Sequence, residues 1–165
     1  MPATAACGSA DESDPVFPRK RPCASTAGRT PSHSVDIPAY SATWPCEPRT
    51  AGLARGLVRA ALHTWELDGL VDRATLITSE LVSNSVQHSG GRLLRVGIAL
   101  PEREVVRLSV SDRSTAHPVP CPPDLRSEHG RGLLLVEALA DSWETDIRAW
   151  GKVIRAELRT RNTRA

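Results

Sequence analysis

Three polar residues recur at intervals of four in a segment that otherwise reads as an amphipathic helix. Glu80, Asn84 and His88 are each about 40° further round such a helix than the one before, so they share one stripe. Glu80 comes three residues after the apolar Ile77. Asn84 follows Leu81 at the same interval, so the polar stripe lies at the rim of the buried face. These side chains could line the wall of a pocket. The alternative interpretation is that they form a solvated helix edge.

A single carboxylate continues the inward face of a predicted strand. Val106, Leu108 and Val110 alternate with polar residues, and Asp112 follows at period two, where it would point inward. A buried carboxylate is costly unless it is hydrogen-bonded, and at the end of a strand it can point into a cleft. The alternative is that the strand has ended and that Asp112 opens a turn with Ser114.

Two glycines open a third helical segment, in the run His129-Gly130-Arg131-Gly132-Leu133. Backbone amides at a helix N-terminus, with no Cβ atoms in the way, form a ready phosphate site. A lone Gly-x-Gly is weak support for such a site, because one glycine that caps the helix and one that relieves crowding would also explain the pair.

Three helices must position these groups. Apolar residues recur at helical spacing from Pro48 to Trp65. A second helix is expected from about Leu70 to His88, where Ser89-Gly90-Gly91 ends it. The third covers Gly130 to Ala140.

Strands are expected between and after the helices. Apolar and polar residues alternate at 92–100 and 103–112, with a turn at Pro101-Glu102-Arg103. Two more strands, at 143–149 and 152–158, are joined through Gly151. Residues 35–40 are expected as a first strand, which Pro38 would confine to a sheet edge. Helices gathered on one face of a mostly antiparallel sheet make an α+β fold, a two-layer sandwich.

Composition places the chain among ordinary globular proteins. Its 165 residues suit one domain, with 40% hydrophobic and 24% charged residues. Lys and Arg number 21 and Asp and Glu 19, a net charge of +2 without a concentrated basic face, so no direct nucleic-acid partner is expected. Residues 1–34 show no period and are expected as a disordered tail, followed by a domain at 35–160 and a tail at 161–165. The proline-rich stretch after Asp112 is expected as a functional loop.

The cysteines and the apolar runs bear on the compartment. The four cysteines are scattered, with no histidine at ligand spacing, so a zinc site is not expected. We expect free thiols in a reducing compartment. No run reaches the 18 or so apolar residues that span a bilayer. Acidic residues interrupt any signal-peptide core near the start of the chain. The expectation is a cytoplasmic protein with no membrane partner.

The order of these features resembles a known family. Glu80-Leu-Val-Ser-Asn84-Ser-Val-Gln-His88 looks like the N box of the Bergerat-fold ATPases, the histidine kinase and Hsp90-like proteins. Asp112 looks like the acid of their first glycine box, and Gly130-Arg-Gly-Leu133 like their second. Within that superfamily the chain most resembles the bacterial anti-sigma-factor serine/threonine kinases, over about residues 35–159.

The resemblance implies a role for each residue. Glu80 would be the general base that takes the proton from a serine hydroxyl of a partner protein. Asn84 would hold Mg²⁺, and Asp112 would accept a hydrogen bond from the adenine amino group of ATP. The remaining implied cofactor-binding residues are His88, Ser114, Gly130, Arg131, Gly132 and Leu133. The implied partners are a sigma factor and an anti-sigma antagonist, and related kinases pair as homodimers.

The first glycine box departs from the family pattern. It reads Asp112-Arg-Ser-Thr-Ala116, without the two usual glycines. The first hypothesis is therefore a kinase of the anti-sigma type, which the retained Glu80 favours. The second is a non-catalytic adaptor that binds ATP and switches partner binding, which the altered box favours. A zinc hydrolase using Glu80 and His88 has the wrong spacing for a His-Glu-x-x-His helix.

Overall fold

The computed structural model describes residues 37–115 and 131–160, all of which belong to the unit His33–Ala165. The tails expected at 1–34 and 161–165, and the proline-rich loop after Asp112, lie largely or wholly outside these residues. No helix within the described ranges is long and apolar enough to cross a membrane.

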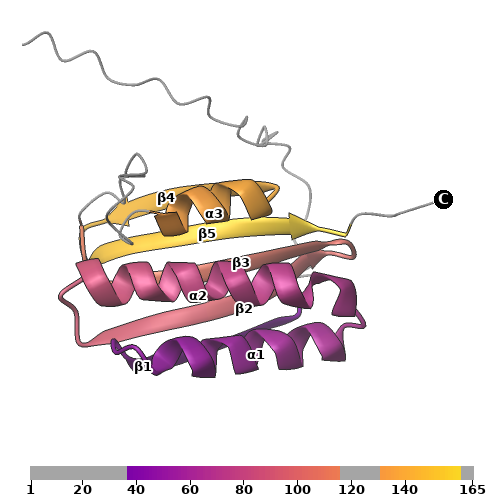
Figure 1. Ribbon diagram of the computed structural model, residues 1–165, viewed down its shortest axis with the longest axis horizontal. Coiled ribbons are helices and arrows are strands. Elements are labelled where there is room, and N and C mark those ends of the chain that lie inside the picture. The colour runs from indigo at the N-terminus through magenta and orange to yellow at the C-terminus, as the bar shows by residue number, and fades with distance from the viewer. Residues whose placement is uncertain (1–36, 116–130, 161–165) are drawn as a thin grey trace, which may run out of the picture. The chain divides into compact units, whose positions relative to one another are not determined.

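Five strands form one sheet in the order β1-β2-β3-β5-β4, and every neighbouring pair is antiparallel (Figure 1). The strands are β1 (Ala39–Pro45), β2 (Leu93–Glu102), β3 (Val105–Asp112), β4 (Ser142–Arg148) and β5 (Gly151–Arg159). β1 and β4 are the edge strands, so β5, the last strand of the chain, lies between β4 and the central strand β3.

The helices lie across one face of this sheet, which confirms the expected two-layer α+β fold (Figure 1). They are α1 (Thr50–Thr64), α2 (Val71–His88) and α3 (Arg131–Leu139), with a single 3₁₀ turn, η1 (Asp68–Leu70), before α2. The middle helix α2 packs on both other helices and on β3. Gly90 follows the end of α2 with a φ of +59°, a left-handed conformation that glycine adopts without steric cost.

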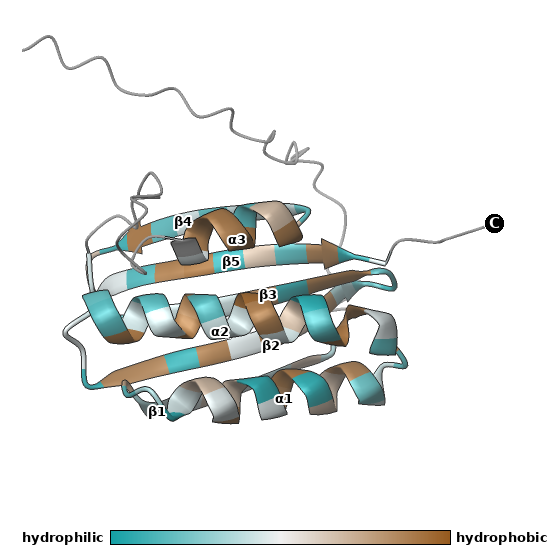
Figure 2. Ribbon diagram, viewed as in Figure 1, coloured by the Kyte–Doolittle hydropathy of each residue, from teal (hydrophilic) through white to brown (hydrophobic). Residues whose placement is uncertain are grey.

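The core fills the space between the two layers. Hydrophobic residues alternate along β2 and gather on α3 (Figure 2), as the periods of strand and helix require. Fully buried side chains from the helices, such as Val58, Leu62 and Ile77, meet Ile98 and Leu108 from the sheet in one continuous cluster. This burial, rather than helix propensity, stabilises helices of 9 to 18 residues.

Two of the predicted strand boundaries were wrong. The first strand spans Ala39–Pro45 rather than 35–40, because that is the segment that pairs in register with β2. Its expected place at a sheet edge is confirmed. β2 continues through Pro101, and the turn falls at residues 103–104 instead. The register shifts between Ala99 and Glu102, and such an irregularity tolerates a residue with no N–H.

Candidate functional site

The polar stripe of α2 lies at the rim of the buried face. Glu80 and Asn84 are half-buried, whereas His88, on the last turn of the helix, is exposed. On their buried side runs the apolar row that contains Ile77 and Leu81, both fully buried. Glu80 and Asn84 therefore border a region from which water is partly excluded, and His88 does not share that environment.

The start of α3 comes directly against Glu80. A Cβ atom added to Gly132 would stand 2.5 Å from Oε2 of Glu80, closer than real Cβ contacts come. The start of α3 therefore lies against the carboxylate, although this flexible side chain could shift to admit a Cβ. The structure brings together the first and third of the predicted motifs, at Glu80 and Gly132, which are 52 residues apart in the chain.

The side chain of Leu133 packs inside the domain. It is 3% exposed and belongs to the hydrophobic core. Its backbone amide is still one of the first in α3, and such amides have no partner within the helix. Gly130 and the side chain of Arg131 lie outside the described residues.

Asp112 points inward, as its position in the alternation predicts, and is 3% exposed. Its Oδ2 accepts a hydrogen bond of 2.6 Å from the hydroxyl of Ser85, the residue next to Asn84 on α2. Its Oδ1 accepts one of 2.8 Å from the backbone N–H of Ser114, which is also buried. The inward position and the turn with Ser114 were alternatives in the sequence, and both are present.

Two residues around Asp112 were missed by the motifs. Lys152, on β5, is 1% exposed and places its Nζ 3.7 Å from Oδ2 of Asp112. Ser85 is equally buried. A signal for each was available: Lys152 precedes Ile154 at period two, and Ser85 follows Leu81 by four, so both continue apolar rows.

The close approach of β5 to Asp112 depends on a glycine. A Cβ on Gly151 would stand 2.0 Å from the carbonyl oxygen of Asp112 and 2.8 Å from Cα of Arg113. Its φ of +154° is also one that other residues rarely adopt. Gly151 therefore lets the β4–β5 hairpin reach the end of β3.

One acceptor at the rim has no donor among the described residues. Oδ1 of Asn84 is buried and makes no hydrogen bond. An unpaired buried carbonyl oxygen loses the hydrogen bonds that water would have given it. An amide oxygen is also a ligand for hard cations such as Mg²⁺, so the donor chemistry fits that ion.

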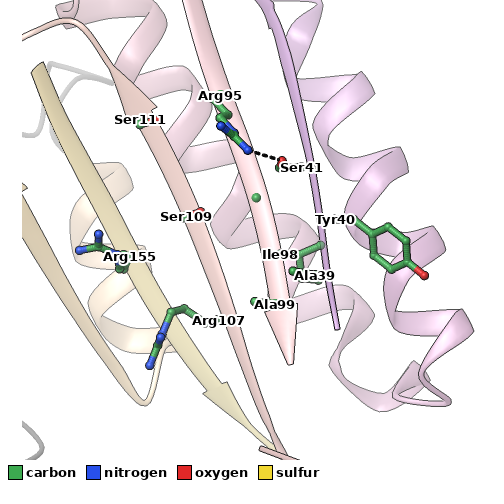
Figure 3. A pocket seen from close by; sticks show the side chains of 11 residues that line it. Ala39, Tyr40, Ser41, Arg95, Ile98, Ala99, Arg107, Ser109, Ser111 and Arg155 are labelled. Atoms are coloured by element: carbon green, nitrogen blue, oxygen red, sulfur yellow. Dashed lines mark hydrogen bonds between the residues drawn. The ribbon is translucent and has the colours of Figure 1, made fainter. Parts of the chain in front are cut away.

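The face of the sheet without helices has a hollow of its own, of about 350 Å³ (Figure 3). Its lining includes Ser41, Arg95, Ser109 and Arg155, and Arg95 donates a hydrogen bond of 2.8 Å to Ser41 across it. These side chains alternate with the core residues of the same strands and so face away from α2. The hollow is therefore separate from the groups around Asp112.

The two-layer α+β fold is that of an ATP-binding domain of the Bergerat type. The chain belongs to the histidine kinase-like ATPase domain family, which matches residues 44–158. Membership of this family implies ATP as the nucleotide. No curated protein matched the chain.

Among solved structures, the chain is similar to the RsbU and RsbW domains of Rv1364c from Mycobacterium tuberculosis. The TM-score is 0.56 and the sequence identity 24%, over 74% of this chain and 32% of that one. At this identity the likeness shows a shared fold. The chain thus corresponds to about a third of that structure's length.

Proposed function

We propose that this chain is an ATP-dependent protein serine/threonine kinase of the anti-sigma type. The observation that carries the proposal is the contact between Glu80 and the glycine start of α3, with the unpaired Oδ1 of Asn84 one turn further along α2. A carboxylate that meets a helix N-terminus stands where the transferred phosphoryl group would be bound. A protein that only binds nucleotide would have no need of a base at that point.

Asp112 would recognise the base. A carboxylate has room for about four hydrogen bonds, and those from Ser85 and Ser114 leave capacity for another donor. The amino group of adenine is such a donor. Because the carboxylate is held from both sides, it would meet the base in a fixed orientation, which lowers the entropy lost on binding.

Asn84 would hold Mg²⁺ through its unpaired oxygen. The described residues contain no group of three His, Cys, Asp or Glu side chains that could bind a metal ion by themselves. The ion would therefore depend on Asn84, water and the phosphates, as is usual for Mg²⁺. When bound, it neutralises charge that develops on the phosphates during transfer.

The backbone amides of Gly130, Arg131 and Gly132 would bind the phosphates at the start of α3. Glu80 would accept the proton of a partner protein's serine hydroxyl as that oxygen attacks the γ-phosphorus and ADP leaves. Ser114 would help to shape the adenine pocket through its bond to Asp112. His88, exposed at the end of α2, would at most contact the outer wall. The partners would be an anti-sigma antagonist as substrate and a sigma factor, and the active form would be a homodimer in the cytoplasm.

Phosphate transfer tests the catalytic part of the proposal. The purified chain would be incubated with γ-labelled ATP and an antagonist-type domain, or the same domain with its acceptor serine replaced by alanine. We expect transfer by wild type to the serine form alone, and a loss of 10²-fold or more, in order of magnitude, for Glu80→Gln. Glu104→Gln, in the exposed β2–β3 turn, is the matched control and should keep wild-type activity.

Calorimetric titration with ATP, with and without Mg²⁺, tests the pocket. We expect Asn84→Ala to lose the dependence of affinity on Mg²⁺ and Asp112→Asn to lose most of the affinity. Gln87→Ala, exposed on the same helix, should behave as wild type. Failure of the wild type to bind at millimolar ATP would refute the nucleotide mechanism altogether.

A second candidate is an adaptor in which ATP only switches partner binding. The absence of glycines in Asp112-Arg-Ser-Thr-Ala116 favours it, since a stiffer segment beside the base offers less freedom for turnover. Wild type that binds ATP but transfers no phosphate to any antagonist domain tested would favour the adaptor over the kinase.

A further inference from the structure

A lysine side chain buried among core residues needs an explanation. Lys152 is 1% exposed and has the largest of the fully buried side chains. Removing an ammonium group from water is costly unless a counter-charge and hydrogen bonds replace the lost hydration. Its neighbours on the same face of β5, such as Ile154 and Ala156, are apolar and fully buried.

The sheet register supplies the counter-charge. Lys152 lies directly opposite Asp112 in the antiparallel pairing of β5 with β3, and both residues face the helices. Nζ lies 3.7 Å from Oδ2, the same oxygen that accepts the hydroxyl of Ser85. Lys152 and Ser85 therefore hold Oδ2 from two sides.

We propose that Lys152 is a positioning residue that determines base specificity, because its ion pair with Oδ2 holds the acceptor oxygens of Asp112 toward the nucleotide base. The inference rests on the proposed nucleotide binding and adds to it the residue that selects the base. An ionised carboxylate accepts hydrogen bonds and donates none, whereas a protonated carboxyl carries a donor. A carboxylate held in one orientation thus pairs best with a purine edge that presents a donor to it.

Purines differ in the group that they present. Adenine carries a 6-amino group, a donor, and hypoxanthine carries a 6-keto oxygen, an acceptor. At position 6, the carboxylate of Asp112 accepts from the amino group of adenine but faces another acceptor in hypoxanthine. Without the ammonium group, the carboxylate is held among the described residues only by the neutral donors of Ser85 and Ser114, and it is freer to rotate. The preference for the amino group should then fall.

Among the described residues, the other ionisable groups of the surrounding elements make no ion pair with the carboxylate. Arg113, just after the end of β3, is exposed. On the β1–α1 connection, the thiol of Cys46 contacts the carbonyl oxygen of Ser85 at 3.6 Å and not Asp112. On α2, Glu80 faces the start of α3. Of the described residues, Lys152 alone is recorded in an ion pair with Asp112.

The experiment compares ADP with IDP, its 6-keto analogue, by calorimetric titration of the full chain at one pH. We expect wild type to prefer ADP by about tenfold or more, the size of one well-placed hydrogen bond to a charged group. In Lys152→Met, which keeps length without charge, ADP affinity should fall about tenfold and IDP affinity little, so the preference collapses. Lys152→Arg, which keeps the charge, should retain it within about threefold.

A purely structural role would weaken both nucleotides together and leave their ratio unchanged. That result for folded Lys152→Met overturns the inference while leaving nucleotide binding intact. Should Lys152→Met not fold, Lys152→Gln, a neutral donor of similar length, decides: an undiminished preference for ADP refutes the need for charge. Binding of neither nucleotide by wild type would refute the proposed function as well.

Discussion

The two faces of the sheet carry similar charged side chains under opposite conditions. On the helix-covered face, Asp112 and Lys152 are almost completely buried. On the open face, Arg107 bonds Glu157 at 2.7 Å, and Arg155 lies 3.3 Å from Glu144. The open-face pairs are the shorter ones, yet each has a partner in contact with water: the side chains are 44% and 18% exposed for Arg107 and Glu157, and 26% and 69% for Arg155 and Glu144.

This difference teaches that distance is a poor guide to the importance of an ion pair. Exposed pairs are screened by water, and ordering two long side chains offsets most of their attraction. A buried pair stabilises little as a whole, but removal of one partner leaves an unpaired charge in a medium of low dielectric constant. Groups on the covered face should therefore be sensitive to substitution and those on the open face tolerant.

The largest expected effect comes from breaking one pair on each face. Lys152→Met should lower the free energy of unfolding by about 3–5 kcal/mol, because Asp112 stays buried without its counter-charge. Arg155→Met, on the open face, should lower it by less than about 1 kcal/mol. Urea unfolding followed by circular dichroism would measure both.

Removing both buried charges sharpens this test. The double variant Asp112→Asn, Lys152→Met should be more stable than Lys152→Met alone, since no unpaired charge remains. Equal losses for Lys152→Met and Arg155→Met would contradict the comparison between the faces.

A smaller difference is expected between two serines. Ser85→Ala removes the 2.6 Å hydrogen bond to the buried Asp112 and should cost about 1.5–3 kcal/mol of stability, as for bonds to charged groups. Ser109→Ala, in the hollow of the open face, should change stability by no more than about 0.5 kcal/mol. Thermal unfolding of the two variants beside wild type is the measurement. A loss of stability in Ser109→Ala as large as that in Ser85→Ala would show that burial does not determine the size of the effect.

The smallest expected effect concerns the pH dependence of the open face. The hydrogen bond from Arg148 holds the pKa of Asp146 below its ordinary value of 3.8, with Arg155 adding to the effect and desolvation opposing it. Because the pKa is lower in the folded state, the charged carboxylate stabilises the protein at pH values above its ordinary pKa. This stabilisation is lost as the pH falls through the pKa of the folded state. At pH 7, the unfolding midpoint of Asp146→Asn should thus be slightly lower than that of wild type. This difference in midpoint should vanish under strongly acidic conditions. A difference that grows as the pH falls would contradict the prediction.

Much of the candidate site could be predicted because it depends on local periods. The spacing of Glu80 and Asn84 by four places both at one rim of α2, whatever α2 packs on. The alternation along β3 predicts that Asp112 points inward. The boundaries failed where pairing with a neighbour overrode local pattern, as at Pro101 and in β1.

The sequence by itself determined the elements, the two layers and the faces on which the key side chains lie, because these follow from periods of 3.6 and 2. Only the tertiary structure decided that β5, and not β4, lies beside β3, so that Lys152 stands opposite Asp112. It also decided that Gly132 meets Glu80 and that Gly151 meets the end of β3. Such contacts join residues far apart in the chain, and they depend on strand order and register, which no local period specifies.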